Sequence, residues 1–115
     1  YAMREMKKLQ KTAGGQKEEL LRDTYIEVDL DKLAANVVMI KDMVGPEVAI
    51  TAVIKANGYG HGAWQIAQSI MDAGADYLAV ATLTEALELR EHAIDAPILI
   101  MGHTTDCFIT SRSRV

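Results

Sequence analysis

One lysine in this chain lies where a side-chain amine could do chemistry. Lys55 directly follows a short apolar run, residues 49–54, and it precedes a turn that contains Gly58, Gly60 and Gly62. Burial at the end of a strand disfavours the charged ammonium form, so a lysine held there loses its proton more easily. A neutral amine is what Schiff-base chemistry with a carbonyl cofactor requires. The glycines allow the turn to adopt positive φ and to approach a ligand closely.

Residues 55–62, Lys-Ala-Asn-Gly-Tyr-Gly-His-Gly, closely resemble the segment to which pyridoxal 5'-phosphate (PLP) attaches in bacterial alanine racemases. Other segments resemble the same family: residues 24–30 its opening strand, 76–91 its next strand and helix, and 96–102 the strand after that. The resemblance therefore extends over residues 24–102. It implies a PLP-dependent enzyme that interconverts L-alanine and D-alanine.

The resemblance also implies roles for single residues. In the family the lysine carries PLP as an imine and is one acid or base at the substrate Cα, and these roles fall on Lys55. Tyr59 is expected to contact the PLP phosphate, aided by the glycine amides and the start of the next helix, which favour an anion. Leu83 aligns with a residue that lines the cofactor pocket, although a leucine there could equally belong to the core. His61 and Asn57 are expected to serve the turn itself.

Two alternatives apply to the same segment. Without the residues that follow it, Lys55 would be an ordinary strand-end lysine that extends its amine into solvent. Residues 58–63 also fit the loose G-x-G-x-x-G/A pattern of dinucleotide-binding turns, which normally follows its strand directly and is completed by an acid after the next strand. Here Lys-Ala-Asn intervenes, and the next strand ends at Ala81-Thr82 without an acid, which disfavours nicotinamide binding.

Apolar spacing predicts alternating strands and helices along the chain. The expected strands cover 24–28, 48–54, 77–81 and 97–101, and the expected helices cover 62–73, 84–92 and a stretch from a cap at Asp29 or Asp31 to Gly45-Pro46, with Leu33, Val37, Ile40 and Val44 on one face. The strand at 48–54 lacks polar alternation, which predicts burial on both faces. Two strand–helix units and a further strand indicate parallel strands with right-handed crossovers.

The predicted fold class is α/β. The resemblance implies a partial (β/α)8 TIM barrel, with the first two to three βα units of the family's N-terminal barrel domain present. Such a barrel needs about 250 residues, whereas this chain has 115. We therefore expect a polar N-terminal extension over 1–23, the N-terminal portion of the barrel over 24–102, and a divergent or truncated tail over 103–115. A frame change or early stop would explain that tail, and an authentic divergent loop is the alternative.

Composition excludes several classes of function. The net charge of −4 argues against a nucleic-acid surface, and the chain contains no apolar run long enough for a membrane span. The single cysteine, Cys107, rules out an internal disulfide and fits a reducing, cytoplasmic compartment. The three histidines are scattered, so no metal site is expected. Glu85, Glu88 and Glu91 recur at helical spacing beside Arg90 and predict a solvated helix face.

The predicted function is alanine racemisation, which would supply D-alanine for cell-wall peptidoglycan. The family resemblance implies a homodimer in which the second base, a tyrosine, comes from the partner subunit, so the isolated chain is expected to be inactive. A racemase of serine or another small amino acid would share the same motif. The alternatives of another class are a non-catalytic PLP-binding protein and an inactive fragment.

Overall fold

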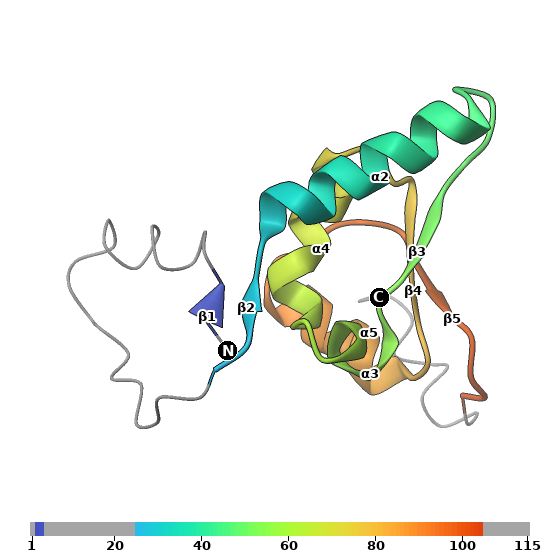
Figure 1. The fold of residues 1–115 in the computed structure, drawn as a ribbon. Helices are drawn as coiled ribbons and strands as arrows, with labels where there is room; N and C mark the ends of the chain where they lie inside the picture. The colour runs from blue at the N-terminus through green and yellow to red at the C-terminus, as the bar shows by residue number, and fades with distance from the viewer. Residues whose placement is uncertain (1, 4–24, 105–115) are drawn as a thin grey trace.

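The computed structural model describes residues 2–3 and 25–104, and from residue 27 onward each strand is followed by one or two helices up to the last strand (Figure 1). The elements are β1 (Ala2–Met3), β2 (Glu27–Val28), α2 (Leu30–Val44), β3 (Thr51–Val53), α3 (Lys55–Tyr59), α4 (Ala63–Asp72), β4 (Tyr77–Val80), α5 (Leu83–Glu91) and β5 (Ile98–Ile100). The expected strands and helices between residues 24 and 101 are therefore found in the expected order, with shorter strands, and the short element α3 occupies the segment that was expected to be a turn. Most of the expected extension over 1–23 and most of the expected tail over 103–115 lie outside the described residues.

Two parallel sheets are present in the described part of the chain. The larger has the order β3-β4-β5, with Thr51 opposite Tyr77 and Ala79 opposite Leu99. The smaller pairs β1 with β2. Strand β1 was not predicted, because residues 1–23 are expected from the sequence to form a polar extension. The parallel pairing of β3, β4 and β5 agrees with the prediction from the two strand–helix units.

Helices cover one face of the larger sheet. Figure 1 shows α4 and α5 on the same side of β3, β4 and β5. Leu78 and Val80 of β4 are fully buried on this side, in one cluster with Ile66, Ile70 and Leu89. Side chains alternate between faces along a strand, so the other face carries a second set of residues. Four of its members are at least partly exposed: Thr51, Val53, Tyr77 and Leu99.

The prediction that residues 48–54 are buried on both faces is wrong. Thr51 and Val53 are exposed and Ala52 is half-buried. The reason is that β3 lies at the edge of the sheet and that helices cover one face of it among the described residues. Burial on both faces is found in the central strand instead, where Leu78, Ala79 and Val80 are all buried.

Helix α2 begins with a side-chain cap and ends at a glycine. The Asp29 carboxylate accepts hydrogen bonds from the N–H groups of Asp31 and Lys32, at 3.1 and 3.2 Å, so Asp29 is the cap. Val37 is buried, as predicted for the apolar face. Ile40 and Val44 were predicted on the same face but are 45% and 41% exposed, because the second half of α2 extends beyond the other helices (Figure 1).

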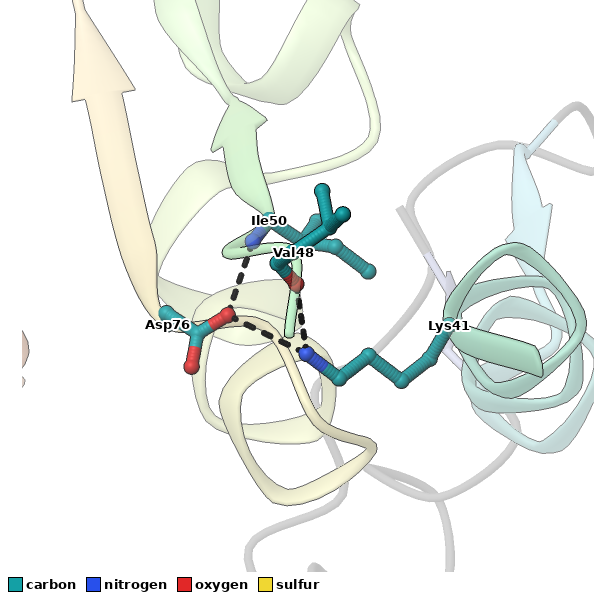
Figure 2. A network of polar contacts seen from close by, with 4 residues as sticks. All are labelled: Lys41, Val48, Ile50 and Asp76. Atoms are coloured by element: carbon teal, nitrogen blue, oxygen red, sulfur yellow. Dashed lines mark hydrogen bonds and ion pairs between the residues drawn. The ribbon is translucent and has the colours of Figure 1, made fainter. Parts of the chain in front are cut away.

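A polar network ties α2 to the amino ends of β3 and β4 (Figure 2). The Lys41 ammonium donates to the Val48 carbonyl oxygen at 2.7 Å and lies 3.7 Å from the Asp76 carboxylate. The same carboxylate accepts the Ile50 N–H at 2.7 Å. Side chains at the amino end of parallel strands in such folds serve stability rather than chemistry. A functional site is therefore expected at the opposite, carboxyl end of the strands.

Candidate functional site

Lys55 lies at the carboxyl end of β3. It follows Ile54, which is 2% exposed and whose N–H donates to the Ala79 carbonyl oxygen of β4 at 2.8 Å. Lys55 itself is exposed, and its ammonium has no hydrogen-bond or ion-pair partner among the described residues. Lys55 was expected from the sequence to be buried at the end of its strand, and the structure does not show this burial. The physical reason is again the open face of the sheet at its β3 edge.

The residues after Lys55 form a left-handed turn. Five consecutive residues have positive φ: Ala56 (51°), Asn57 (55°), Gly58 (64°), Tyr59 (54°) and Gly60 (87°). Side chains with a Cβ pay roughly 1–2 kcal/mol each in this conformation. Short element α3 is therefore strained, and strain of this kind persists where surrounding contacts determine the backbone.

Bonds within the segment stabilise the turn. The Gly58 N–H donates to the Ile54 carbonyl oxygen and the Gly62 N–H donates to the Asn57 carbonyl oxygen, both at 2.9 Å. The Asn57 side chain accepts the Ala63 N–H at 2.9 Å, which joins the turn to the start of α4. His61 Nδ1 lies 3.0 Å from the Gly58 carbonyl oxygen. Asn57 and His61 thus serve the turn, as predicted.

The N–H groups of the glycines are not free to bind a phosphate, which was their expected role. The N–H groups of Gly58, Gly60 and Gly62 all donate to carbonyl oxygens of the same segment, so they are not available to an anion. The expectation that these amides help to bind a phosphate is wrong in this conformation. The same observation removes support from the dinucleotide alternative, which needs an open glycine-rich turn.

Gly58 allows the turn to lie against α4. A Cβ at this position would lie 2.9 Å from Ile66 Cδ1 and 3.3 Å from the Ala63 backbone. The position therefore requires glycine for two reasons, its positive φ and its close approach to a helix. The turn is held against α4 as a consequence.

Glu85 of α5 connects the turn to the end of β4. Its Oε1 accepts the Ala56 N–H at 2.8 Å, and its Oε2 accepts the N–H groups of Ala81 at 2.7 Å and Thr82 at 3.2 Å. The prediction that Glu85 belongs to a solvated helix face is therefore wrong for this residue, which is half-buried. Glu88 and Glu91 are exposed, as that prediction requires.

The Glu85 carboxylate is stabilised in its charged form. Burial by itself raises the pKa of Glu85, but the hydrogen bonds from Ala56, Ala81 and Thr82, together with the charge of Lys55, outweigh it and hold the pKa below its usual value. Sequence spacing missed this residue. The signal that could have found it is Thr82-x-x-Glu85, a capping box whose two halves are both present.

The other two predicted site residues lie near the same edge of the sheet. Tyr59 ends α3 and is 60% exposed, and Leu83 begins α5 and is half-buried. Because β3 and β4 are parallel neighbours, their carboxyl ends meet at one edge, and α3 contacts both β4 and α5. The structure therefore brings Lys55, Tyr59 and Leu83 to one end of the sheet, while their roles stay predictions.

The described residues contain neither a metal-binding cluster nor a membrane-spanning helix. No group of three or more metal-binding side chains lies close enough together to hold an ion in the ranges 2–3 and 25–104. Across the same ranges, every helix is too short or too polar to cross a membrane.

The fold and the site define a class of protein. Parallel strands linked by helices, with polar side chains following the carboxyl ends of the strands, form an α/β protein, a class in which active sites lie at that edge of the sheet. Residues 28–111 match the model of the family described as alanine racemase, N-terminal domain. The chain belongs to this family, whose members depend on PLP.

Individual relatives agree. The chain is 51% identical over 84 residues to alanine racemase 2 of Caldanaerobacter subterraneus subsp. tengcongensis, covering 73% of this chain and 22% of that protein. It is 46% identical over 96 residues to alanine racemase of Geobacillus stearothermophilus, covering 82% and 25%. The solved structure of alanine racemase from Bacillus anthracis with bound L-Ala-P superimposes with a TM-score of 0.70 at 49% identity, covering 72% and 22%. The chain thus spans about a quarter or less of the length of these relatives.

Proposed function

We propose that this chain is the lysine-bearing part of an alanine racemase, in which Lys55 binds PLP covalently and exchanges a proton at the substrate Cα. The observation that carries the proposal is the position of Lys55, an exposed amine at the carboxyl end of β3, followed by a fixed left-handed turn. The similarity to proteins named alanine racemase supports alanine as the substrate.

The residues present fit PLP. The Lys55 amine, which has no partner among the described residues, can condense with the PLP aldehyde with loss of one water. The exposed Tyr59 side chain follows on the same turn and offers a hydroxyl to the phosphate, and Leu83 borders the same edge from α5. Because the glycine amides are engaged, Tyr59 is the donor that this turn contributes to the phosphate.

The proton transfer follows from these positions. When bound, PLP withdraws electrons from the Cα of an attached amino acid and so weakens its Cα–H bond. The amine of the substrate would replace the Lys55 amine at the aldehyde carbon of the cofactor, and the freed Lys55 amine would accept or return the proton on one side of the Cα, the side that gives D-alanine in the family. The second base, a homodimer that supplies it, the complete (β/α)8 barrel and a role in cytoplasmic supply of D-alanine for peptidoglycan belong to this proposal as implications of the family.

The first test maps the covalent bond. We would incubate the 115-residue chain with PLP, reduce it with borohydride and identify the labelled lysine by peptide mapping. Label on Lys55 is expected, with loss of label in Lys55→Arg, since a guanidinium is too weak a nucleophile near neutral pH. Lys32→Arg, on the exposed surface of α2, is the matched control and should keep the label. Label on Lys32 or Lys41 with Lys55 unmodified would contradict the proposal.

The second test addresses the substrate. We would replace the corresponding segment of the Geobacillus stearothermophilus enzyme with residues 28–111 of this chain, and follow D-alanine and D-serine with a coupled oxidase. Racemisation of alanine that Lys55→Arg abolishes is expected. A folded chimera that racemises serine in preference to alanine would replace alanine with serine in the proposal. A folded chimera that binds PLP and racemises neither amino acid would contradict it.

A further inference from the structure

We propose that Glu85 is a positioning residue for Lys55, in that its carboxylate fastens the left-handed turn to the end of β4 and so fixes where the Lys55 amine lies. This inference rests on the proposed function of Lys55. It assigns to α5 a part in the site beyond the pocket-lining position of Leu83.

The geometry gives Glu85 two separate tasks. Oε2 accepts hydrogen bonds from the N–H groups of Ala81 and Thr82, which form the connection that leads from β4 into α5. Oε1 receives the N–H of Ala56, which is 29 residues away in the chain. Within the described ranges, Glu85 is the one residue outside 54–66 whose side chain hydrogen-bonds this turn.

The bond to Ala56 acts directly on Lys55. The Ala56 N–H belongs to the peptide group that joins the two residues, and this group is planar. A fixed N–H direction therefore fixes the backbone from which the Lys55 side chain departs. Ala56 is also the first residue of the turn with positive φ, at 51°, a conformation that a residue with a Cβ keeps only where other contacts impose it.

Charge adds to the geometry. Burial raises the pKa of Glu85, but the three N–H donors and the charge of Lys55 together lower it by more. The net pKa is below its usual value, so the carboxylate is ionised at neutral pH. An ionised acceptor makes shorter and stronger hydrogen bonds than a neutral one. The charge of Glu85 is thus matched both to the backbone donors and to the lysine.

The alternative is that Glu85 only caps α5. The capping box needs the Glu85 side chain at the Thr82 N–H and the Thr82 hydroxyl at the Glu85 N–H, and both bonds are present. Neither of them involves Ala56. Thr82→Ala therefore weakens the cap without touching the bond to the turn, and it serves as the control for a purely structural role.

The central variant is Glu85→Gln. Its side chain has a single acceptor oxygen, which would stay with the two donors at the end of β4, so the amide group would face the Ala56 N–H and that bond would be lost. Glu88→Gln, on an exposed position of the same helix, is the matched control for loss of charge. All variants are made in the 115-residue chain, and their unfolding midpoints are recorded.

Two measurements follow on each variant. The first is the rate of amide hydrogen exchange at Ala56 relative to that at Leu78. Leu78 is fully buried, and its N–H donates to the carbonyl oxygen of Pro97. The second is the PLP concentration needed for half-maximal borohydride labelling of Lys55. In Glu85→Gln we expect relative exchange at Ala56 about tenfold faster and a labelling concentration about tenfold higher, the effect of losing one charge-assisted hydrogen bond. Thr82→Ala and Glu88→Gln should leave both values close to those of the unaltered chain.

The outcomes separate the two proposals. Unchanged Ala56 exchange and unchanged labelling in Glu85→Gln would overturn the positioning role while leaving Lys55 as the PLP lysine. Equal losses in Glu85→Gln and in Thr82→Ala, in proportion to their unfolding midpoints, would also overturn it and leave Glu85 as a cap. Label in the unaltered chain on a lysine other than Lys55 would overturn the proposed function, and the positioning role with it.

Discussion

Replacement of Gly58 by alanine tests whether the turn is held against α4 by shape. Two costs arise, since the new Cβ must accept φ of +64° and would meet Ile66 Cδ1 at 2.9 Å. The left-handed conformation costs about 1–2 kcal/mol and the overpacking about 1–3 kcal/mol, against a gain below 1 kcal/mol from the stiffer unfolded chain. We expect the free energy of unfolding to fall by about 2–4 kcal/mol.

The second part of that cost can be isolated with Ile66→Val. This change removes the Cδ1 atom and should itself cost about 0.5–1.5 kcal/mol, because Ile66 is buried. In the double variant the contact at 2.9 Å no longer exists. The loss in the double variant should therefore be smaller than the sum of the two single losses by about 1–2 kcal/mol.

Urea unfolding followed by circular dichroism measures the free energy of unfolding of the unaltered chain, of Gly58→Ala, of Ile66→Val and of the double variant. Gly45→Ala is the control, because Gly45 has φ of +87° and an added Cβ there would meet nothing within 4 Å. Its loss should add to that of Ile66→Val within about 0.5 kcal/mol, as expected for independent sites. Additive losses for Gly58→Ala and Ile66→Val as well would show that Ile66 does not limit the position, and the shape argument would be wrong.

The remaining predictions concern the site. Tyr59→Phe should weaken PLP retention by about tenfold or more, since a hydrogen bond to a charged acceptor is worth about 1.5–3 kcal/mol; equal PLP titrations for the two proteins would return Tyr59 to a packing role. Because the pKa of Glu85 is lowered in the folded state, its carboxylate stabilises the fold at any pH above the usual pKa of glutamate. This contribution is lost as the pH falls through the pKa that Glu85 has in the folded state. Unfolding midpoints measured from neutral to acid pH should therefore fall less steeply in Glu85→Gln than in the unaltered chain, and parallel curves would refute this. The 115-residue chain with excess PLP should form D-alanine no faster than PLP with free lysine, because barrel active sites draw residues from many strand ends.

The order of α2, α4, α5 and the parallel strands β3, β4 and β5 could be predicted from the sequence because it depends on local patterns, whereas β1 and α3 could not. Apolar spacing indicates α2, α4 and α5, and short apolar runs between helices indicate parallel strands. The burial of β3 could not be predicted in this way. Thr51 and Val53 lie in an apolar run that is typical of a buried strand. Their exposure depends instead on the position of β3 at the edge of the sheet and on what covers the open face.

The site shows the same division. Lys55 and the glycines after it could be identified from residue type and spacing. The left-handed conformation of Ala56 and Tyr59 could not, because residues with a Cβ disfavour it and contacts made elsewhere in the fold impose it. Glu85 has the same helical spacing as Glu88. The capping box with Thr82 marks Glu85 in the sequence, but its hydrogen bond to Ala56 depends on the three-dimensional approach of α5 to the turn.

The open sheet has a consequence for any measurement on this chain. Strands β3 and β5 each pair on one side only among the described residues, and Tyr77 and Leu99 are 46% and 55% exposed. A second molecule that covers either surface binds the folded state and not the unfolded one, so mass action raises the apparent stability with protein concentration. Unfolding midpoints of variants are comparable at one concentration only, and a dilution series separates the stability of a single chain from that of its association.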